Sequence, residues 1–279
     1  MNIKEPLTNS KKLNIIAIAD NSQLGEASFL HGIQLARAFK ASLIVCTNFD
    51  LYIENKQKKS LITAFSYDST LFSDVETTFI SDYFFPETLF NFAERNNTAI
   101  IVLGVDNYEK KAKITPKKAI KFIKESRFPI MVVANKPKND NHYNEVLLSL
   151  DMERQNKEKA LWAGYFNRFN NSIVHILTPE YKDEGLAKLV KDNVDFVEKL
   201  YANLDIKYKL TSHKSSSYFD KSALEYAKNH NIGTSIIMMT KYYTLADIIT
   251  GPRERKIIGK SDIPLLCINQ RDDLYVLCT

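Results

Sequence analysis

The chain has 279 residues, a hydrophobic content of 44% and a charged content of 25%, which are ordinary values for a folded soluble protein. Its net charge of +5 is mildly basic, but the lysines are scattered along the chain, which disfavours nucleic-acid binding. No apolar run reaches the ~18 residues of a membrane span, and residues 1–12 lack the apolar centre of a signal peptide. The cysteines lie far apart, and Cys46 and Cys267 sit in apolar runs, so we expect reduced thiols in a cytoplasmic protein.

The first half of the chain alternates apolar runs with helical patterns. Helical spacing of apolar residues predicts helices over 24–39 and 86–96, and a third helix should begin at Thr115-Pro116, where proline suits the first turn. The region 48–74, with its lysine-rich stretch 56–59, is the least legible. Residues 136–142 are short, polar and contain proline, so they are expected to link two domains, 1–135 and 143–279. The apolar runs expected as strands are 13–19, 42–47, 75–81, 98–104 and 127–133.

The second half repeats this order. Helices are expected over 156–169, 183–204 and 217–230, and a short one should run from Gly251-Pro252 to about Lys260. The last strand is expected to start with Pro264, and the run at 206–212 alternates as a half-buried strand does. The final residues include Leu274-Tyr275-Val276-Leu277, which could add an edge strand or cover one. The expected strands are 145–150, 172–178, 206–212, 234–240 and 262–269.

Matching landmarks indicate that the two halves are an internal duplication. Asp20 and Asp151 each end the first strand of a half, and Pro129 and Pro264 each precede the last apolar run at nearly equal spacing. Strands that alternate with helices predict a parallel sheet covered on both faces. The sequence therefore predicts two tandem α/β domains, flavodoxin-like or Rossmann-like, each with a five-stranded parallel sheet, related by a pseudo-two-fold axis.

In such sheets, ligands bind beyond the carboxyl ends of the strands, where the strand order reverses. One candidate surface follows the first and fourth strands of the first half, and the other occupies the same place in the second half. Asp20 and Asp151 could orient a ribose or a metal-bound phosphate, but capping of a turn explains them equally well. The candidate ligand-binding residues are Asp20, Asn21, Ser22, Gly104 and Thr115 in the first half, and Asp151, Met152, Thr240, Gly251 and Arg253 in the second.

These residues resemble the universal stress protein family over nearly the whole chain, twice. The matching segments are Ile-Ile-Ala-Ile-Ala-Asp20-Asn-Ser, Gly251-Pro-Arg-Glu-Arg-Lys-Ile-Ile and Asp262-Ile-Pro-Leu-Leu-Cys-Ile, while Met238-Met239-Thr240 is similar to tandem members from Bacteroidota. The resemblance implies a flavodoxin-like fold, a role in stress physiology and, in some members, ATP binding. Family dimers associate through the last strand. The two halves are therefore expected to pack as an intrachain pseudo-dimer, and whether two chains also form a homodimer stays open.

The ATP-binding members carry Gly-x2-Gly-x9-Gly-Ser/Thr between the fourth strand and the last helix. Glycines let backbone N–H groups wrap phosphate, and a helix start adds a favourable dipole. Here the second glycine position holds Asn107 or Tyr243, and the spacing to the helix start is shorter in both halves. Pro116 and Pro252 stand where Ser or Thr would meet phosphate.

Two functions therefore remain open at the level of sequence. The first is a non-enzymatic stress-response or regulatory protein with degenerate nucleotide-binding loops. The second is an adenine-nucleotide binding protein, for ATP or AMP, with slow hydrolysis at one site. The second half is then favoured because it keeps Gly251, Arg253 and, on the ribose side, Asp151. The histidines and cysteines show no metal-ligand spacing, and no Ser–His–Asp or Cys–His arrangement is recognisable.

Overall fold

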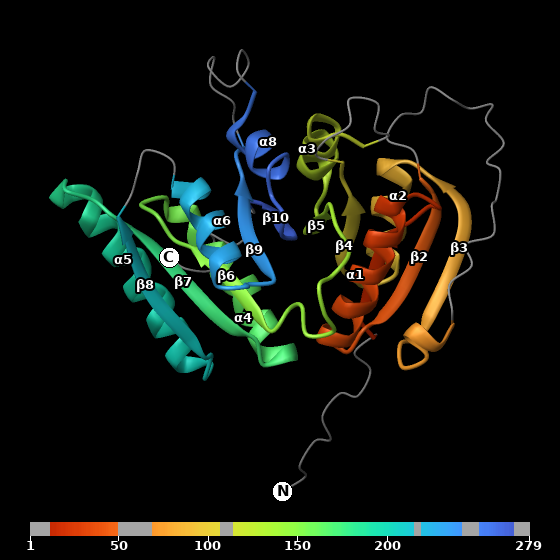
Figure 1. Ribbon diagram of the computed structural model, residues 1–279, viewed down its shortest axis with the longest axis horizontal. Helices are drawn as coiled ribbons and strands as arrows, with labels where there is room; N and C mark the ends of the chain where they lie inside the picture. The colour runs from red at the N-terminus through yellow and green to blue at the C-terminus, as the bar shows by residue number, and fades with distance from the viewer. Residues whose placement is uncertain (1–11, 50–68, 107–113, 215–218, 242–250, 271–279) are drawn as a thin grey trace, which may run out of the picture.

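We describe a computed structural model of the chain, over residues 12–49, 69–106, 114–214, 219–241 and 251–270. These residues form one ten-stranded sheet in the order β3-β2-β1-β4-β5-β10-β9-β6-β7-β8. In Figure 1, β3 and β8 form the two edges of the sheet, and β5 and β10 lie side by side in its middle. The lysine-rich stretch 56–59, the second glycine positions 107 and 243, and the run 274–277 lie outside the described residues.

The elements of the first half follow the predicted order. The last strand is shorter than predicted because Ser126 and Phe128 form a turn first: the Phe128 N–H donates to Ser126 Oγ at 3.0 Å. The predicted third strand is shifted toward the carboxyl end. The elements are β1 Asn14–Ile18, α1 Gln23–Phe39, β2 Ser42–Phe49, the 3₁₀ turn η2 Ser69–Phe72, β3 Thr77–Phe84, α2 Pro86–Arg95, β4 Thr98–Gly104, α3 Pro116–Glu125 and β5 Ile130–Val133.

The second half repeats that order, with three corrections to the prediction. Most residues of β8 are exposed, so this strand is not half-buried. Pro252 is the N-cap of a six-residue helix, with φ −62° and ψ 152°, and does not lie inside its first turn. Pro264 precedes the last strand. The elements are β6 Glu145–Ser149, the 3₁₀ turn η3 Arg154–Asn156, α4 Lys157–Asn170, β7 Ile173–Glu180, α5 Glu184–Asn203, β8 Tyr208–Lys214, α6 Phe219–Asn229, β9 Thr234–Met239, α8 Arg253–Ile258 and β10 Leu265–Asn269.

Within each half all paired strands are parallel, and the antiparallel pairing of β5 with β10 joins the two halves. The strand order reads the same from both edges when each strand is matched to its counterpart in the other half. Met131 pairs with Leu266, and these residues are themselves counterparts when Pro129 is matched to Pro264. The last strands of the two halves therefore pair at the centre of the duplication.

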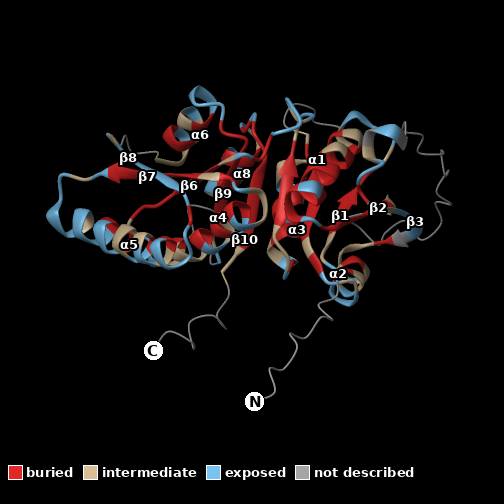
Figure 2. Cartoon of the chain, turned by 90° about the horizontal axis from the view of Figure 1, so that it is seen from below, coloured by how far each residue is buried: buried red, intermediate tan, exposed pale blue. Residues whose placement is uncertain are grey.

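Helices cover both faces of the sheet, as the alternation of side chains along each strand requires. In β1, Ile15 and Ala17 belong to a core shared with α1, α4 and α5, whereas Ile16 and Ile18 belong to a core shared with α2 and α3. Figure 2 shows buried residues in the inner strands of the sheet and on the helix surfaces that face them, and exposed residues on β8 and on the outer sides of α2, α5 and α6. The predicted α/β fold is confirmed.

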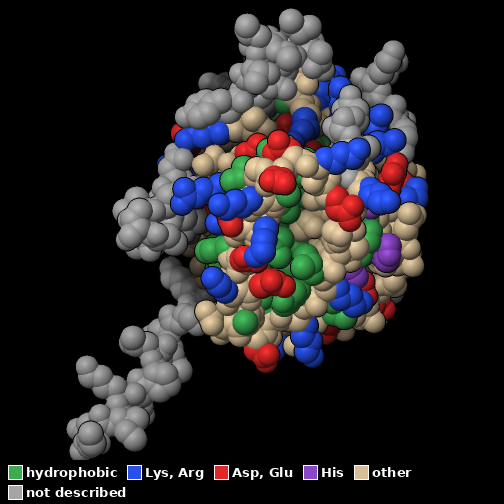
Figure 3. Space-filling view, turned by 90° about the vertical axis from the view of Figure 1, so that its left-hand side faces the viewer, with side chains coloured by type: hydrophobic (Ala, Val, Ile, Leu, Met, Phe, Trp, Pro, Cys, Tyr) green, Lys and Arg blue, Asp and Glu red, His purple; other side chains and the backbone are tan. Residues whose placement is uncertain are grey.

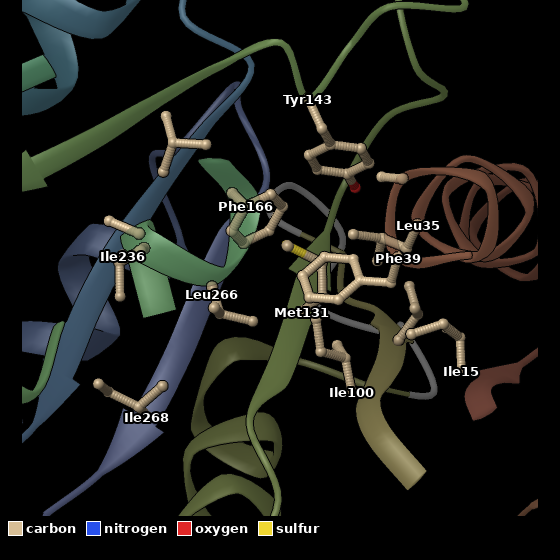
Figure 4. Close-up of a cluster of buried hydrophobic side chains, with 14 of the residues drawn as sticks. Ile15, Leu35, Phe39, Ile100, Met131, Tyr143, Phe166, Ile236, Leu266 and Ile268 are labelled. Atoms are coloured by element: carbon tan, nitrogen blue, oxygen red, sulfur yellow. The ribbon is translucent and has the colours of Figure 1, made fainter. Parts of the chain in front are cut away.

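The core continues across the junction between the halves. The Phe39 ring of α1 meets the Phe166 ring of α4 edge-on, with centroids 5.0 Å apart. Figure 4 shows these two rings beside Tyr143, with Met131 and Leu266 of the central strands in the same cluster. One hydrophobic core thus includes side chains from both halves.

The β8 edge of the sheet faces the viewer in Figure 3. Hydrophobic side chains gather in the middle of this face, surrounded by charged ones. Leu189 and Phe196 of α5 and Leu210 of β8 are among the exposed large hydrophobic residues. Exposed Lys209 and Lys214 lie on β8 itself, and lysine on an edge strand discourages pairing with another sheet.

Candidate functional site

The first candidate surface begins at the turn that follows β1. The Ser22 N–H donates to Asp20 Oδ1 at 3.1 Å, and the Ser22 hydroxyl donates to the same oxygen. Ser22 Oγ in turn accepts from the Gly25 N–H at 3.0 Å, so Ser22 is the N-cap of α1. Asn21 lies exposed between them. These bonds connect Asp20 and Ser22 to the start of the helix.

Two glycines allow α1 to approach the sheet at this point. A Cβ on Gly104, at the end of β4, would lie 2.5 Å from the Leu24 carbonyl oxygen. A Cβ on Gly25 would lie 2.2 Å from the Asp20 carbonyl oxygen. Both separations are far below van der Waals contact, so the backbone leaves no room for a side chain. Close packing of α1 therefore accounts for Gly104 without any bound phosphate.

A small pocket lies between these residues. Asp20, Ser22 and Gly104 line it, together with Thr47 and Ile114, and its volume is about 40 Å³. A water molecule needs ~10–15 Å³ by this measure, whereas small-molecule sites usually have ~300–1,000 Å³. The described residues thus leave space for a few water molecules. Thr115 follows the lining residue Ile114 and is the N-cap of α3.

The second candidate surface begins at Asp151, which is 9% exposed. Asp151 Oδ1 accepts from the Glu153 N–H at 2.8 Å and from the side-chain amide of Asn156. The Asn193 amide of α5 donates to the Asp151 carbonyl oxygen at 2.8 Å. Asp151 therefore holds the turn after β6 and the start of α4 in place, as the capping interpretation expects. The neighbouring Met152 accepts a hydrogen bond at Sδ from the Tyr181 hydroxyl, at 3.1 Å.

A carboxylate lies at the end of β9. Glu254 Oε1 accepts from the Thr240 N–H at 2.8 Å and from the Thr240 hydroxyl. Glu254 is 1% exposed, and its second oxygen, Oε2, has no hydrogen-bond partner among the described residues. The short helix α8 begins one residue earlier, at Arg253. Both polar hydrogens of Thr240 are thus already used by an anionic group of the same chain.

A cluster of charged side chains lies next to this carboxylate and is linked to it through Asp220. Lys159 of α4 is 4% exposed, and its Nζ donates to Ser149 Oγ at 3.2 Å. Burial lowers the pKa of Lys159 from 10.5 to about 8; Asp151 and Asp220 oppose that shift and Arg253 adds to it. Burial raises the pKa of Asp220, and Arg253, which pairs with it at 2.9 Å, partly offsets this effect.

The turn before α8 contains Gly251 at φ +80°, a conformation that favours glycine. A Cβ there would lie 3.4 Å from Cδ of Arg255, so space alone does not require glycine. The fold therefore brings together some of the residues predicted for the second site. Asp151 and Arg253 share a charge cluster, Thr240 joins it through Glu254, and Met152 contacts Tyr181.

Three buried or partly buried charged residues of this cluster were not among the sequence predictions: Lys159, Asp220 and Glu254. A signal for Lys159 was present, because it directly precedes Ala160 and lies one turn before Ala163 on the buried face of α4. When Asp20 is matched to Asp151, the residue of the first half that corresponds to Lys159 is Ser28. Ser28 is also buried, and its hydroxyl donates to the Val102 carbonyl at 3.1 Å. Glu254 carried no such signal, because its burial depends on the packing of a six-residue helix.

The described part of the chain contains neither a metal-binding cluster nor a membrane-spanning helix. It contains no group of three or more His, Cys, Asp and Glu side chains placed to hold a metal ion. None of the helices described there is long and apolar enough to cross a membrane.

Comparisons with known proteins connect this geometry to solved structures. No protein-family model and no curated protein matches the chain. A universal stress protein from Archaeoglobus fulgidus is similar in structure, with 14% sequence identity and a TM-score of 0.60, over 93% of this chain and 97% of that chain. A candidate universal stress protein from Pseudomonas aeruginosa has 13% identity and a TM-score of 0.58, over 95% of both chains. A functionally unknown protein from the same species has 11% identity and a TM-score of 0.57, over 95% of both chains. The TM-scores show that these chains share an α/β fold with this protein along nearly its full length. At identities this low, the similarity shows the fold alone.

Proposed function

We propose that this chain is a tandem member of the universal stress protein family and acts as a non-enzymatic stress-response or regulatory protein. The doubled strand order, the fold similarity over nearly the whole chain and the motif resemblance in both halves support this assignment. In the proposal, residues 1–135 and 143–279 are two domains that form a pseudo-dimer through β5 and β10. Since that pairing occupies both last strands, a homodimer of the chain would use another surface.

The observation that carries the proposal is the position of Glu254. In the resembled ATP-binding motif, donors between the fourth strand and the last helix hold phosphate. Here the N–H and the hydroxyl of Thr240, at the same place, both donate to a buried carboxylate. Like charges a few ångströms apart repel strongly in a poorly solvated site. A phosphate group would have to displace Glu254 before it could use these donors.

The first half is restricted in a different way. Gly104, which is the first glycine of the resembled motif, packs against the Leu24 carbonyl, and the pocket beside it has a volume of about 40 Å³. A nucleotide needs a much larger concave site. The proposal therefore gives both halves a role in binding partners through their surfaces.

A cytoplasmic location fits the cysteine chemistry. Cys46 and Cys267 are both buried and unpaired. Burial raises the pKa of Cys46 to about 12 and raises that of Cys267 as well, which keeps both thiols protonated and unreactive.

A second candidate function is binding of ATP or AMP in the second half, with slow hydrolysis. The specific observation in its favour is the pair of basic side chains, Lys159 and Arg253, which interact within one charge cluster that also contains Asp151. If Glu254 moved away, these groups could face a phosphate group.

Calorimetric titration of the full chain with Mg-ATP and with AMP separates the two functions. We expect no heat of binding from the natural sequence. Glu254→Ala releases both Thr240 donors and should create measurable affinity for Mg-ATP. Glu254→Gln removes the charge but leaves an amide oxygen on the Thr240 donors, so its affinity for Mg-ATP should be weaker than that of Glu254→Ala. Glu225→Gln removes an exposed carboxylate of α6 and serves as the matched control for charge.

Micromolar binding of Mg-ATP or AMP by the natural sequence, lost in Gly251→Val or Asp151→Ala, would reject the non-binding proposal. It would then establish the nucleotide-binding alternative for the second half.

A further inference from the structure

A second and much larger hollow lies where β4 and β5 begin and where β10 ends. Its volume is about 870 Å³, which is within the usual range for a site that holds a ligand or a peptide segment. Leu161, Trp162 and Tyr165 of α4 line one side, the turn between α3 and β5 lines another, and Gln270 lies at the end of β10. Leu161 is 37% and Tyr165 is 40% exposed. We call this hollow the α4 groove.

The duplication identifies the counterpart of the α4 groove in the first half. When Asp20 is matched to Asp151, His31 corresponds to Trp162 and Gln34 to Tyr165. Yet His31 is only 1% exposed and Gln34 only 8%. The difference arises because the counterpart surface on α1 is covered by another part of the chain.

The covering segment is the stretch that connects β5 to β6. His31 Nε2 donates to the Asn135 carbonyl at 3.0 Å, and the Gln34 amide donates to the Asn139 carbonyl at 2.7 Å. Since Nε2 carries the hydrogen, Nδ1 of His31 accepts from the Tyr143 hydroxyl at 2.7 Å. The segment that leaves β5 thus turns back over α1 and is held there by hydrogen bonds from two polar side chains.

The segment that leaves β10 is the counterpart of this connection. When Pro129 is matched to Pro264, Gln270 corresponds to Asn135. Gln270 is one of the residues that line the α4 groove. By the same match, Leu274 corresponds to Asn139 and Cys278 to Tyr143, so residues 271–279 have enough length to repeat the path of the connection.

Each segment matches the surface of its own half in polarity: the first pair is polar and the second pair is apolar. The connection is polar, and it meets His31 and Gln34. The final segment contains Leu274-Tyr275-Val276-Leu277, and its counterpart surface presents Leu161, Trp162 and Tyr165. An apolar segment gains more from burial against aromatic and aliphatic side chains than a polar one does.

We propose that residues 271–279 of this chain bind in the α4 groove, with Leu274–Leu277 packed against Leu161, Trp162 and Tyr165. The segment covers α4 as the connection covers α1, and so completes the symmetry of the molecule. This binding does not depend on the proposed function, because it follows from the duplication and from the exposed surface of α4.

Trp162 is the single tryptophan of the chain, so its fluorescence reports on the groove directly. The test compares the full chain with a chain that ends after Gln270, by emission maximum and by acrylamide quenching. We expect truncation to shift the emission to longer wavelength and to raise the quenching constant several-fold. β10 ends at Asn269, so the truncation leaves every described strand intact.

A full-length variant excludes the trivial explanation that truncation damages the fold. Leu274→Asp with Val276→Asp should give the same red shift and the same increase in quenching as truncation. The double change Asp272→Asn and Asp273→Asn keeps the apolar run and should quench like the natural sequence.

Two outcomes would overturn the proposal. Equal quenching of the full and truncated chains would mean that the segment does not cover Trp162. Protection that disappears on dilution, together with a dimer in sedimentation at high concentration, would show that a second copy of the chain occupies the groove instead.

Discussion

Lys159 shows how a single side chain can change the character of a repeated site. Its counterpart in the first half is Ser28, a neutral residue that a backbone carbonyl satisfies. In the second half a buried cation takes this position, and two carboxylates, Asp151 and Asp220, offset its charge. A buried charge without partners would lower the free energy of unfolding strongly, because it loses its hydration and gains no compensating interaction. The cluster is therefore consistent with mutual neutralisation as its main role.

The pH dependence of stability should reveal Lys159. Its pKa is 10.5 in the unfolded chain and about 8 in the folded one, so between these values the unfolded chain binds more protons. Stability from this group therefore rises as pH increases from about 8 to 10.5, by roughly 3 kcal/mol in total. Lys159→Met should remove that rise, measured as the free energy of unfolding in urea at pH 7.5 and at about pH 10.

Lys221→Met is the matched control, because Lys221 is exposed on α6. Its pH dependence should follow that of the natural sequence. Identical curves for Lys159→Met and the natural sequence would show that Lys159 is not buried as a cation.

At the scale of elements, the sequence predicts the interior of each helix and strand better than its ends. The bounds of β4 match the prediction because strong local signals flank it: Asn97 takes a positive φ of 47°, and Gly104 contacts the Leu24 backbone. The exposure of β8 was mispredicted because alternation does not say whether a helix covers the alternate residues. The connection between the halves reads as a polar linker, yet His142 is 8% and Tyr143 is 2% exposed.

That connection should make the protein sensitive to acid. Burial is the main cause that lowers the pKa of His31 to about 3 and that of His142 to about 4, from an ordinary value of 6.5. Below pH 6.5 the unfolded chain therefore binds protons that the folded chain does not, and stability falls as pH decreases. For each histidine the loss between pH 6.5 and 5 is roughly 2 kcal/mol.

His31→Gln should reduce this fall by about half, since an amide can occupy the site without titrating and His142 remains. Urea unfolding from pH 7 to 5 provides the measurement. His230→Gln, which changes an exposed histidine at the end of α6, should retain the slope of the natural sequence. A His31→Gln chain with an unchanged slope would contradict the assignment of the acid sensitivity to the connection.

At the scale of the whole molecule, the landmark residues revealed the duplication, and the resemblance to family dimers predicted that the two halves pack through their last strands. The charge cluster was not legible, because it depends on which side chains three separate elements bring together: α4, α6 and α8. The sequence did not reveal that the two halves share one hydrophobic core. Phe39 and Phe166 belong to different halves, and the sequence contains no pattern that pairs one ring with the other.

The shared core predicts that the chain unfolds as one unit. Leu43 of β2 is fully buried in the first half, and Leu43→Ala should cost ~2–5 kcal/mol through the lost contacts and the cavity. Trp162, the single tryptophan, lies on α4 in the second half, so its fluorescence follows the unfolding of that half. If the core that contains Met131 and Leu266 couples the halves, Leu43→Ala should lower the urea midpoint measured by Trp162 fluorescence as much as the midpoint measured by circular dichroism. Leu210→Ala, at a position on β8 that is 45% exposed, is the control and should shift both midpoints little. A fluorescence midpoint that stays in place while part of the circular dichroism signal is lost earlier would show that the two halves unfold independently.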